Sequence, residues 1–273
     1  MADNKRSERL VAMTKTLLDQ PATIFSLGHF TQTLGAAKST VSEDLTYLRE
    51  VFSALDLGRI ETFPGVAGGV RYLPLLSQEG ILALVEELCL KLRSPQRVLP
   101  GGFLYMTDII FSPQWSARLG DVFASLFYER APEAVITVET KGIPLALMTA
   151  RALGLPLVTI RHDSRVTEGP AVSVTYLSGS DRRMSNMSLP RRALPTGARV
   201  ILIDDFMRAG GTVRGMMDLL AEFQAQVVGT GVLVETARPV EKVVQEYISL
   251  VVLEQVDEVQ KEVLLAPNPR LAK

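Results

Sequence analysis

The sequence predicts an α/β protein of two domains, with a winged helix over residues 1–74 and an α/β domain with a mostly parallel sheet over residues 75–273. Its 273 residues are 47% hydrophobic, enough for one large core and a smaller one. Near the N-terminus, three helical patterns precede two extended runs, which is the order of elements in a winged helix. From Gln78 onward, strand and helix signals alternate, as in a sheet covered on both faces. The boundary between the two patterns falls at 74–78.

The first two helices are predicted over residues 7–20 and Leu27–Leu34. Pro21 ends the first because proline cannot continue a helix, and Gly35 turns the chain after the second. Helical spacing predicts that the first helix packs through one apolar stripe, which consists of Leu10, Val11, Leu17 and Leu18.

The third helix is predicted to begin at Ser39 or Thr40, with Thr40 and Glu43 forming a capping box. Its apolar residues recur at helical spacing and are Val41, Leu45, Leu48 and Phe52. The extended runs Arg59–Phe63 and Val70–Leu73 flank a loop rich in glycine and proline, so they predict a β-hairpin.

Polar residues cluster at the start of the third helix, where a recognition helix presents side chains to base edges and phosphates. The predicted DNA-contacting residues are Lys38, Ser39, Thr40 and Ser42 on this helix, with Arg6, Arg9, Arg59 and Arg71 against the flanking backbone. Residues 1–74 hold eight lysines and arginines and eight aspartates and glutamates, and this balance counts against DNA binding. A plain interaction module therefore stays an alternative.

The second domain is predicted to alternate helices and extended segments. In order, they are helix Ser77–Leu92, extended segment Phe103–Ile110, helix Gln114–Arg130, strand Ala134–Val138, helix Pro144–Leu153 and strand Leu157–Ile160. Thr140, Lys141 and Gly142 follow a strand and precede a helix, which is where open α/β sheets bind ligands. By itself, this turn is more typical of a plain strand-to-helix connection.

Residues 200–212 carry the strongest chemical signal. Val200–Ile203 is a continuous apolar run, typical of a parallel strand covered on both faces. Arg208–Thr212 can wrap backbone N–H groups around a phosphate, since two glycines permit the tight turn and Thr212 opens a helix. Asp204 and Asp205 would repel that phosphate and instead suit sugar hydroxyls. Together these features predict a ribose 5-phosphate site.

Composition excludes several other classes of protein. The single cysteine, Cys89, lies at helical spacing among leucines and is expected to be a core thiol. With only His29 and His162, we expect no metal site made by protein side chains alone. The N-terminus lacks a signal-peptide pattern and no apolar run reaches the length of a membrane span, so we expect a cytoplasmic protein. The net charge of -1 means that a nucleic acid must be bound by local basic patches or by a dimer.

The string IDDFMRAGGT resembles the signature of type I phosphoribosyltransferases, which bind phosphoribosyl pyrophosphate (PRPP). The resemblance implies a phosphoribosyltransferase-like fold in which TKG forms the pyrophosphate loop and Ser173–Ser180 takes the place of a mobile loop. Ala209 departs from the family, which usually has threonine there, and His162 stands where relatives tend to have lysine. Tyr105 or Phe103 can cover the ligand, although core or interface packing is the alternative for both. The implied PRPP-binding residues are Thr140, Lys141, Gly142, Arg161, Asp204, Asp205, Phe206, Met207, Arg208, Ala209, Gly210, Gly211 and Thr212.

Further strings extend the resemblance over nearly all of residues 5–235 and point to the purine-operon repressors of bacteria. They include AKSTVSEDLT, VAGGVRYLP, LPGGFLYMTDI and YLSGS. This resemblance implies a homodimeric repressor that binds a double-stranded DNA operator and is released by PRPP without catalysing transfer. It implies PRPP as effector, with Mg²⁺ as its possible companion, and guanosine tetraphosphate is a candidate competitor. The alternatives are an active purine phosphoribosyltransferase with an N-terminal oligomerisation module, and a nucleotide-binding scaffold.

Overall fold

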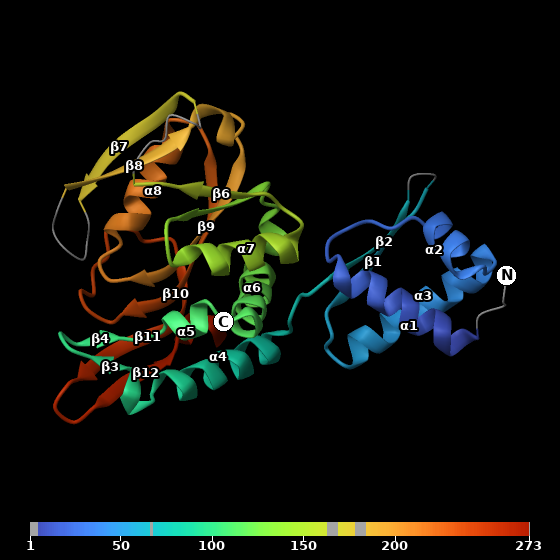
Figure 1. Ribbon diagram of the computed structural model, residues 1–273, viewed down its shortest axis with the longest axis horizontal. Helices are drawn as coiled ribbons and strands as arrows, with labels where there is room; N and C mark the ends of the chain where they lie inside the picture. Colours follow the sequence, from blue (N-terminus) through green and yellow to red (C-terminus); the bar gives the residue numbers. More distant parts are fainter. Residues whose placement is uncertain (1–4, 66–67, 163–168, 178–183, 273) are drawn as a thin grey trace. The chain divides into compact units, whose positions relative to one another are not determined.

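The computed structural model describes residues 5–65, 68–162, 169–177 and 184–272 (Figure 1). The chain forms two compact units. The first comprises Met1–Ser77 with Arg151–Gly154, and the second comprises Gln78–Ala150 with Leu155–Lys273. Within the described ranges, no helix combines the length and the apolar character needed to cross a membrane.

The first unit has the predicted order of a winged helix: α1 (Arg6–Asp19), α2 (Leu27–Leu34), α3 (Lys38–Ala54), β1 (Arg59–Phe63) and β2 (Gly69–Leu73). The two strands pair antiparallel as a hairpin, with Arg59 opposite Leu73. Ser26 caps α2 by accepting the backbone N–H of His29, and Gly35 ends it with a left-handed φ of 66°. The predicted ends of α2 are therefore confirmed, together with the turn that follows it.

The core of the first unit joins all three helices to the hairpin. Its members include Met13, Leu17, Phe30, Val41, Leu45, Leu48, Phe52 and Val70. The predicted stripe of α1 is wrong in part, because Val11 is 70% exposed and Leu18 is 40% exposed. Leu17 of that stripe is buried as predicted, and Arg9 and Met13 complete the buried face of α1. A charged residue in that face is the reason why apolar spacing misplaced it.

The predicted capping box of α3 is also wrong. The helix begins at Lys38, so Ala37 is the N-cap residue, and it makes no side-chain capping bond. Thr40 consequently lies inside the first turn, where it cannot act as the cap.

The second unit is built on a six-stranded sheet in the order β12-β11-β10-β9-β5-β6, parallel except for β12. Its strands are β5 (Ala134–Val138), β6 (Leu157–Ile160), β9 (Arg199–Met207), β10 (Gln226–Thr236), β11 (Ile248–Asp257) and β12 (Glu262–Pro267). Its helices are α4 (Gln78–Leu92), α5 (Thr107–Ile110), α6 (Pro113–Phe127), α7 (Gly142–Leu153, which belongs to this unit as far as Ala150) and α8 (Gly211–Ala221). Two hairpins lie outside the sheet, formed by β3 (Val98–Leu99) with β4 (Phe103–Leu104) and by β7 (Ala171–Leu177) with β8 (Met184–Pro190).

The prediction of an extended segment over Phe103–Ile110 is largely wrong. Only Phe103–Leu104 is a strand, and Thr107–Ile110 is the short helix α5. Ile109 and Ile110 are both fully buried, which successive residues of a half-exposed strand cannot be, because they point to opposite faces.

Strand β9 occupies the middle of the sheet and pairs in parallel with both β5 and β10. Its run Val200–Ile203 is fully buried, as the continuous apolar pattern predicts. The strand continues four residues beyond that run, to Met207, so both aspartates lie on the strand itself. Because parallel strands end at one edge of a sheet, the segments after β5, β9 and β10 meet there.

Candidate functional site

A cavity of about 530 Å³ lies at this edge of the sheet. Every residue of the predicted segment 204–212 lies on its wall, as do Lys141 and Phe103. Phe103 is 66% exposed, which fits a residue at the rim rather than in the core. The cavity therefore brings together the carboxylate pair, the glycine loop and one lysine of the turn after β5.

The two aspartates differ in burial and in charge environment. Asp204 is only 4% exposed, and its Oδ1 accepts the backbone N–H of Asp205 at 3.0 Å. Burial, reinforced by the neighbouring charge of Asp205, raises the pKa of Asp204 well above its usual range. Burial also raises the pKa of Asp205, while the ammonium of Lys141 acts in the opposite direction. Lys141 thus favours the ionised form of Asp205.

The glycine loop leads directly into the first turn of α8. Gly210 is the N-cap residue, with a left-handed φ of 87°, and the first helical bond runs from the N–H of Arg214 to the carbonyl of Gly210. Helix α8 begins one residue before the predicted Thr212. The N–H groups of a first helical turn have no intrahelical acceptor and attract anions.

The carbonyl side of the loop is fixed by the segment after β10. The N–H of Val243 donates to the carbonyl of Ala209 at 2.9 Å, and Lys242 Nζ donates to the carbonyl of Arg208 at 2.6 Å. Thr236 Oγ1 reaches the same Arg208 carbonyl at 3.4 Å. These three bonds hold the loop through the carbonyl oxygens of Arg208 and Ala209, and none of them uses a backbone N–H group of the loop.

The remaining predicted ligand-binding residues, Thr140, Gly142, Arg161 and Tyr105, are not among the described residues that line the cavity. Gly142 nevertheless packs against the site, since a Cβ built on it would lie 3.5 Å from Asp204 Oδ1 and 2.4 Å from Thr137 Oγ1. Of the predicted mobile loop, residues 173–177 belong to β7, and 178–180 lie outside the described residues.

Arg161 extends toward Glu139, with 3.9 Å between Nη1 and Oε2. The same carboxylate accepts the backbone N–H of His162 at 2.7 Å. Glu139 therefore ties together the ends of β5 and β6 beside the turn that carries Thr140 and Lys141.

Several lining residues were missed by sequence reasoning. They include Gly101, Gly102, Met106, Thr236, Arg238 and Leu253–Val256. The pair Gly101 and Gly102 did offer a signal in the sequence, because consecutive glycines favour a tight turn. In the structure both adopt left-handed φ values, 86° and 71°. Arg238 was also within reach of inference, since it follows the end of β10, a strand that must end beside β9.

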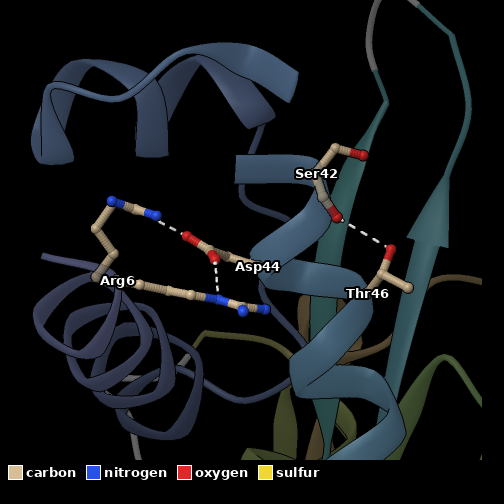
Figure 2. A network of polar contacts seen from close by, with 5 residues as sticks. Arg6, Ser42, Asp44 and Thr46 are labelled. Atoms are coloured by element: carbon tan, nitrogen blue, oxygen red, sulfur yellow. Dashed lines mark hydrogen bonds and ion pairs between the residues drawn. The ribbon is translucent and has the colours of Figure 1, made fainter. Parts of the chain in front are cut away.

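The predicted DNA face lies on the first unit. Lys38, Ser39 and Ser42 are exposed on α3, and Thr40 is half-buried. Figure 2 shows the polar network behind this face, in which Asp44 joins α3 to α1. Asp44 is 1% exposed and accepts Arg6 Nε at 3.2 Å and Arg9 Nε at 2.7 Å.

The structure assigns different places to the two arginines of α1. Arg9 is only 9% exposed, so its guanidinium is buried against Asp44 and not presented to a DNA backbone as predicted. Its burial follows from its position on the packed face of α1, where it pairs with the buried carboxylate. The side chain of Arg6 remains 60% exposed and stacks over Tyr47, with 5.0 Å from its guanidinium carbon to the ring centroid.

The arginines of the hairpin share one carboxylate. Arg71 Nε donates to Glu61 Oε2 at 2.9 Å, and Arg59 Nη1 lies 3.7 Å from Glu61 Oε1. Arg71 and Glu61 face each other across the two strands. Arg71 also lies over the ring of Phe63, 5.0 Å from its centroid. Glu61 thus holds both basic side chains along the hairpin.

Two family models match the chain. The family described as "Bacterial purine repressor, N-terminal" covers residues 5–74, and the "Phosphoribosyl transferase domain" covers residues 114–265. Similar curated proteins include the purine biosynthesis transcriptional repressor PurR of Bacillus subtilis, 45% identical over 95% of this chain and 91% of that protein. The purine biosynthesis transcriptional activator PurR of Lactococcus lactis is 38% identical over 93% of each chain.

The second unit alone resembles enzymes. A xanthine phosphoribosyltransferase of Deinococcus deserti is 34% identical over 57% of this chain and 80% of that enzyme. Among solved structures, adenine phosphoribosyltransferase from Saccharomyces cerevisiae superposes with a TM-score of 0.54 at 21% identity, covering 61% of this chain and 98% of that one. At this identity the likeness establishes the fold, which is that of the phosphoribosyltransferases.

Proposed function

We propose, since this chain belongs to the family of bacterial purine repressors, that it represses purine biosynthesis genes and that PRPP bound in the second unit releases it from DNA. The observation that supports PRPP as the effector is the cavity in which Asp204 and Asp205 lie beside the loop 208–212. Carboxylates accept hydrogen bonds from ribose hydroxyls, and the loop donates to the 5′-phosphate.

The pyrophosphate end of PRPP has cations available at the same cavity. Lys141, Arg208 and Arg238 all line it. Lys and Arg bind phosphates through charge-assisted hydrogen bonds, and the pyrophosphate carries the larger share of the ligand's charge. Mg²⁺ bound together with PRPP would neutralise phosphate charge, and Asp204 and Asp205 are the carboxylates at the cavity that could help to hold it.

Release from DNA requires a difference in affinity. PRPP displaces DNA only if it binds the DNA-free state more tightly than the DNA-bound state. We propose that the regulator acts as a homodimer on a two-fold symmetric operator, because dimers place two recognition helices on successive turns of the major groove. The relative from Lactococcus lactis is named an activator, so the sign of regulation needs its own measurement.

The second candidate function is purine phosphoribosyl transfer, favoured by the likeness to the xanthine enzymes. We propose that this activity is absent. The loop carries Ala209 in place of the hydroxyl side chain usual in the transferases, and the whole-chain relatives are named as regulators. Release of pyrophosphate with adenine, guanine, hypoxanthine or xanthine at more than about 1 s⁻¹, the low end of typical enzymes, would establish the transferase instead.

The test is a fluorescence-anisotropy titration of purine-gene control DNA with the wild type and with the double variant Asp204→Asn, Asp205→Asn. PRPP is expected to release the wild type, while the double variant binds DNA normally and stays bound at all PRPP concentrations. Asp218→Asn is the matched control, because Asp218 lies on α8, pairs with Arg214 and does not line the cavity. Release of the double variant by PRPP would remove the carboxylate pair from the mechanism.

Guanosine tetraphosphate is proposed as a competitor, because it too presents phosphates and a ribose to this cavity. In the same titration it should restore DNA binding at a fixed PRPP concentration. Because PRPP does not release the double variant, the site is tested by calorimetry: equal affinity of the wild type and the double variant for guanosine tetraphosphate would place its site elsewhere.

A further inference from the structure

Helix α3 presents two small hydroxyl side chains one turn apart on its exposed face. Ser42 and Thr46 are exposed, whereas Val41, Leu45 and Leu48 on the opposite face are buried. Figure 2 shows both hydroxyl residues on the side of α3 turned away from Arg6 and Asp44. Thr46 was not among the residues that sequence reasoning selected.

The hydroxyl proton of Thr46 is already used. Thr46 Oγ1 donates to the backbone carbonyl of Ser42 at 3.0 Å. A hydroxyl has one proton and two lone pairs, so in this arrangement Oγ1 can only accept a further hydrogen bond. The γ-methyl group of threonine stands on the same Cβ. Thr46 therefore offers a partner one acceptor and one methyl group.

This pair of groups has a specific match in the major groove. Adenine presents the N6 amino donor there and its partner thymine presents a methyl group, whereas a G·C pair presents its donor on cytosine N4 and has no methyl group. Ser42 differs from Thr46, because its hydroxyl can rotate to donate or to accept. The two residues are about 6 Å apart along the helix axis, close to two base-pair steps.

The rotation of α3 about its axis is fixed by the buried ion pair of Asp44 with Arg9. Asp44 lies two residues before Thr46, on the packed side, and is held by both Arg6 and Arg9. A helix anchored in this way presents its exposed side chains in one orientation, which base-specific contacts require.

We propose that Thr46 is a specificity-determining residue that reads the adenine of one A·T base pair in the operator. The inference rests on the proposed DNA-binding function. The acceptor oxygen meets adenine N6, and the methyl group contacts the thymine methyl.

The experiment compares Thr46→Val with the wild type on the operator and on every single-base-pair variant of it. Thr46→Val keeps the branched shape and loses the acceptor. The wild type is expected to lose about 5- to 150-fold in affinity when the adenine at one A·T position is replaced, or when its amino group is removed by a purine analogue. Thr46→Val should lose that preference at this position alone, and Thr46→Ser should retain the preference for the amino group.

Thr33→Val is the matched control. Thr33 is also exposed, lies on α2 and donates Oγ1 to the carbonyl of His29 at 2.7 Å, so it removes an equivalent bond from a different helix. Its base preferences should equal those of the wild type. Equal weakening of Thr46→Val at all positions, or an unchanged profile, overturns the proposal while leaving the proposed function intact. If the wild type does not distinguish operator from random DNA, the proposed function is contradicted, and with it the proposal that Thr46 recognises a base.

Discussion

Asp44 shows how a single buried charge can stabilise a small domain. Its carboxylate is 1% exposed and faces Arg9, which is 9% exposed. Removal of one partner from a buried ion pair leaves an uncompensated charge, so Asp44→Ala should lower the free energy of unfolding of the first unit by about 3–5 kcal/mol. The side chain of Arg6 is 60% exposed, so its bond to Asp44 adds little to this figure.

Urea unfolding followed by circular dichroism measures this effect. The only tryptophan, Trp115, belongs to the second unit, so its fluorescence reports that unit separately. Asp19→Ala is the control, because Asp19 pairs with Lys15 on the exposed side of α1. Equal unfolding midpoints for the two variants would mean that Asp44 contributes no more than a surface pair.

Asp204 carries a stability penalty that depends on pH. Its pKa is raised in the folded protein above the unfolded value of about 4, because burial disfavours the carboxylate. The folded state thus binds more protons than the unfolded state between these two values, and stability falls as pH rises through that window. Without ligand, Asp204→Asn should therefore be more stable than the wild type at pH 8, with a smaller difference at pH 5.

Thermal unfolding of both proteins at the two pH values tests this sign. Asp218→Asn, at a half-exposed carboxylate of the same unit, should show no such gain. A variant Asp204→Asn that is less stable than the wild type at pH 8 would show that the carboxylate stabilises the empty site.

At the scale of elements, the entry into α8 depends on one backbone conformation. Gly210 has a φ of 87°, and a Cβ built on it meets Met207 Sδ at 3.4 Å, so strain and not a clash opposes a side chain. Gly210→Ala should lower the free energy of unfolding by about 1–2 kcal/mol and weaken PRPP binding, because the loop that receives the phosphate is displaced.

Gly197→Ala separates these two effects. Gly197 has a φ of 79°, has no atom within 4 Å of a built Cβ and does not line the cavity. It should show similar destabilisation with unchanged PRPP affinity by calorimetry. If Gly210→Ala binds PRPP as the wild type does, the loop's conformation is not needed for the ligand.

Elements with a strong period or a continuous apolar run were predictable from the sequence. Helix α2, strand β5 and strand β6 have the predicted ends, and β9 is buried as its run indicates. Prediction failed where another force outweighed the pattern. On α1 the ion pair of Arg9 belongs to the packed face while Val11 and Leu18 of the predicted stripe are exposed, and α5 formed where an extended segment was expected.

At the scale of the molecule, the site was predictable only where it is continuous in sequence. Residues 204–212 line the cavity as expected, because a strand and the turn after it stay together in any fold. The segments at Gly101–Gly102 and Leu253–Val256 join them through the sheet order, which carries no local signal. The role proposed for Thr46 depends on a hydrogen bond within α3, which has no signal in the sequence.

The two units have separate cores, so the proposed regulation by PRPP must pass between them as a difference in binding free energy. Coupling of this kind is reciprocal: the factor by which PRPP weakens operator binding must equal the factor by which operator DNA weakens PRPP binding. In typical couplings of this kind, one ligand changes the affinity for the other by about 5- to 150-fold.

The most direct test of PRPP-released DNA binding is therefore the PRPP dissociation constant, measured by calorimetry on the full chain without DNA and with saturating operator. Random DNA of the same length serves as control. We predict that operator DNA raises the constant by at least about fivefold, by the same factor that PRPP weakens operator binding. An unchanged PRPP dissociation constant in the presence of operator would contradict the account.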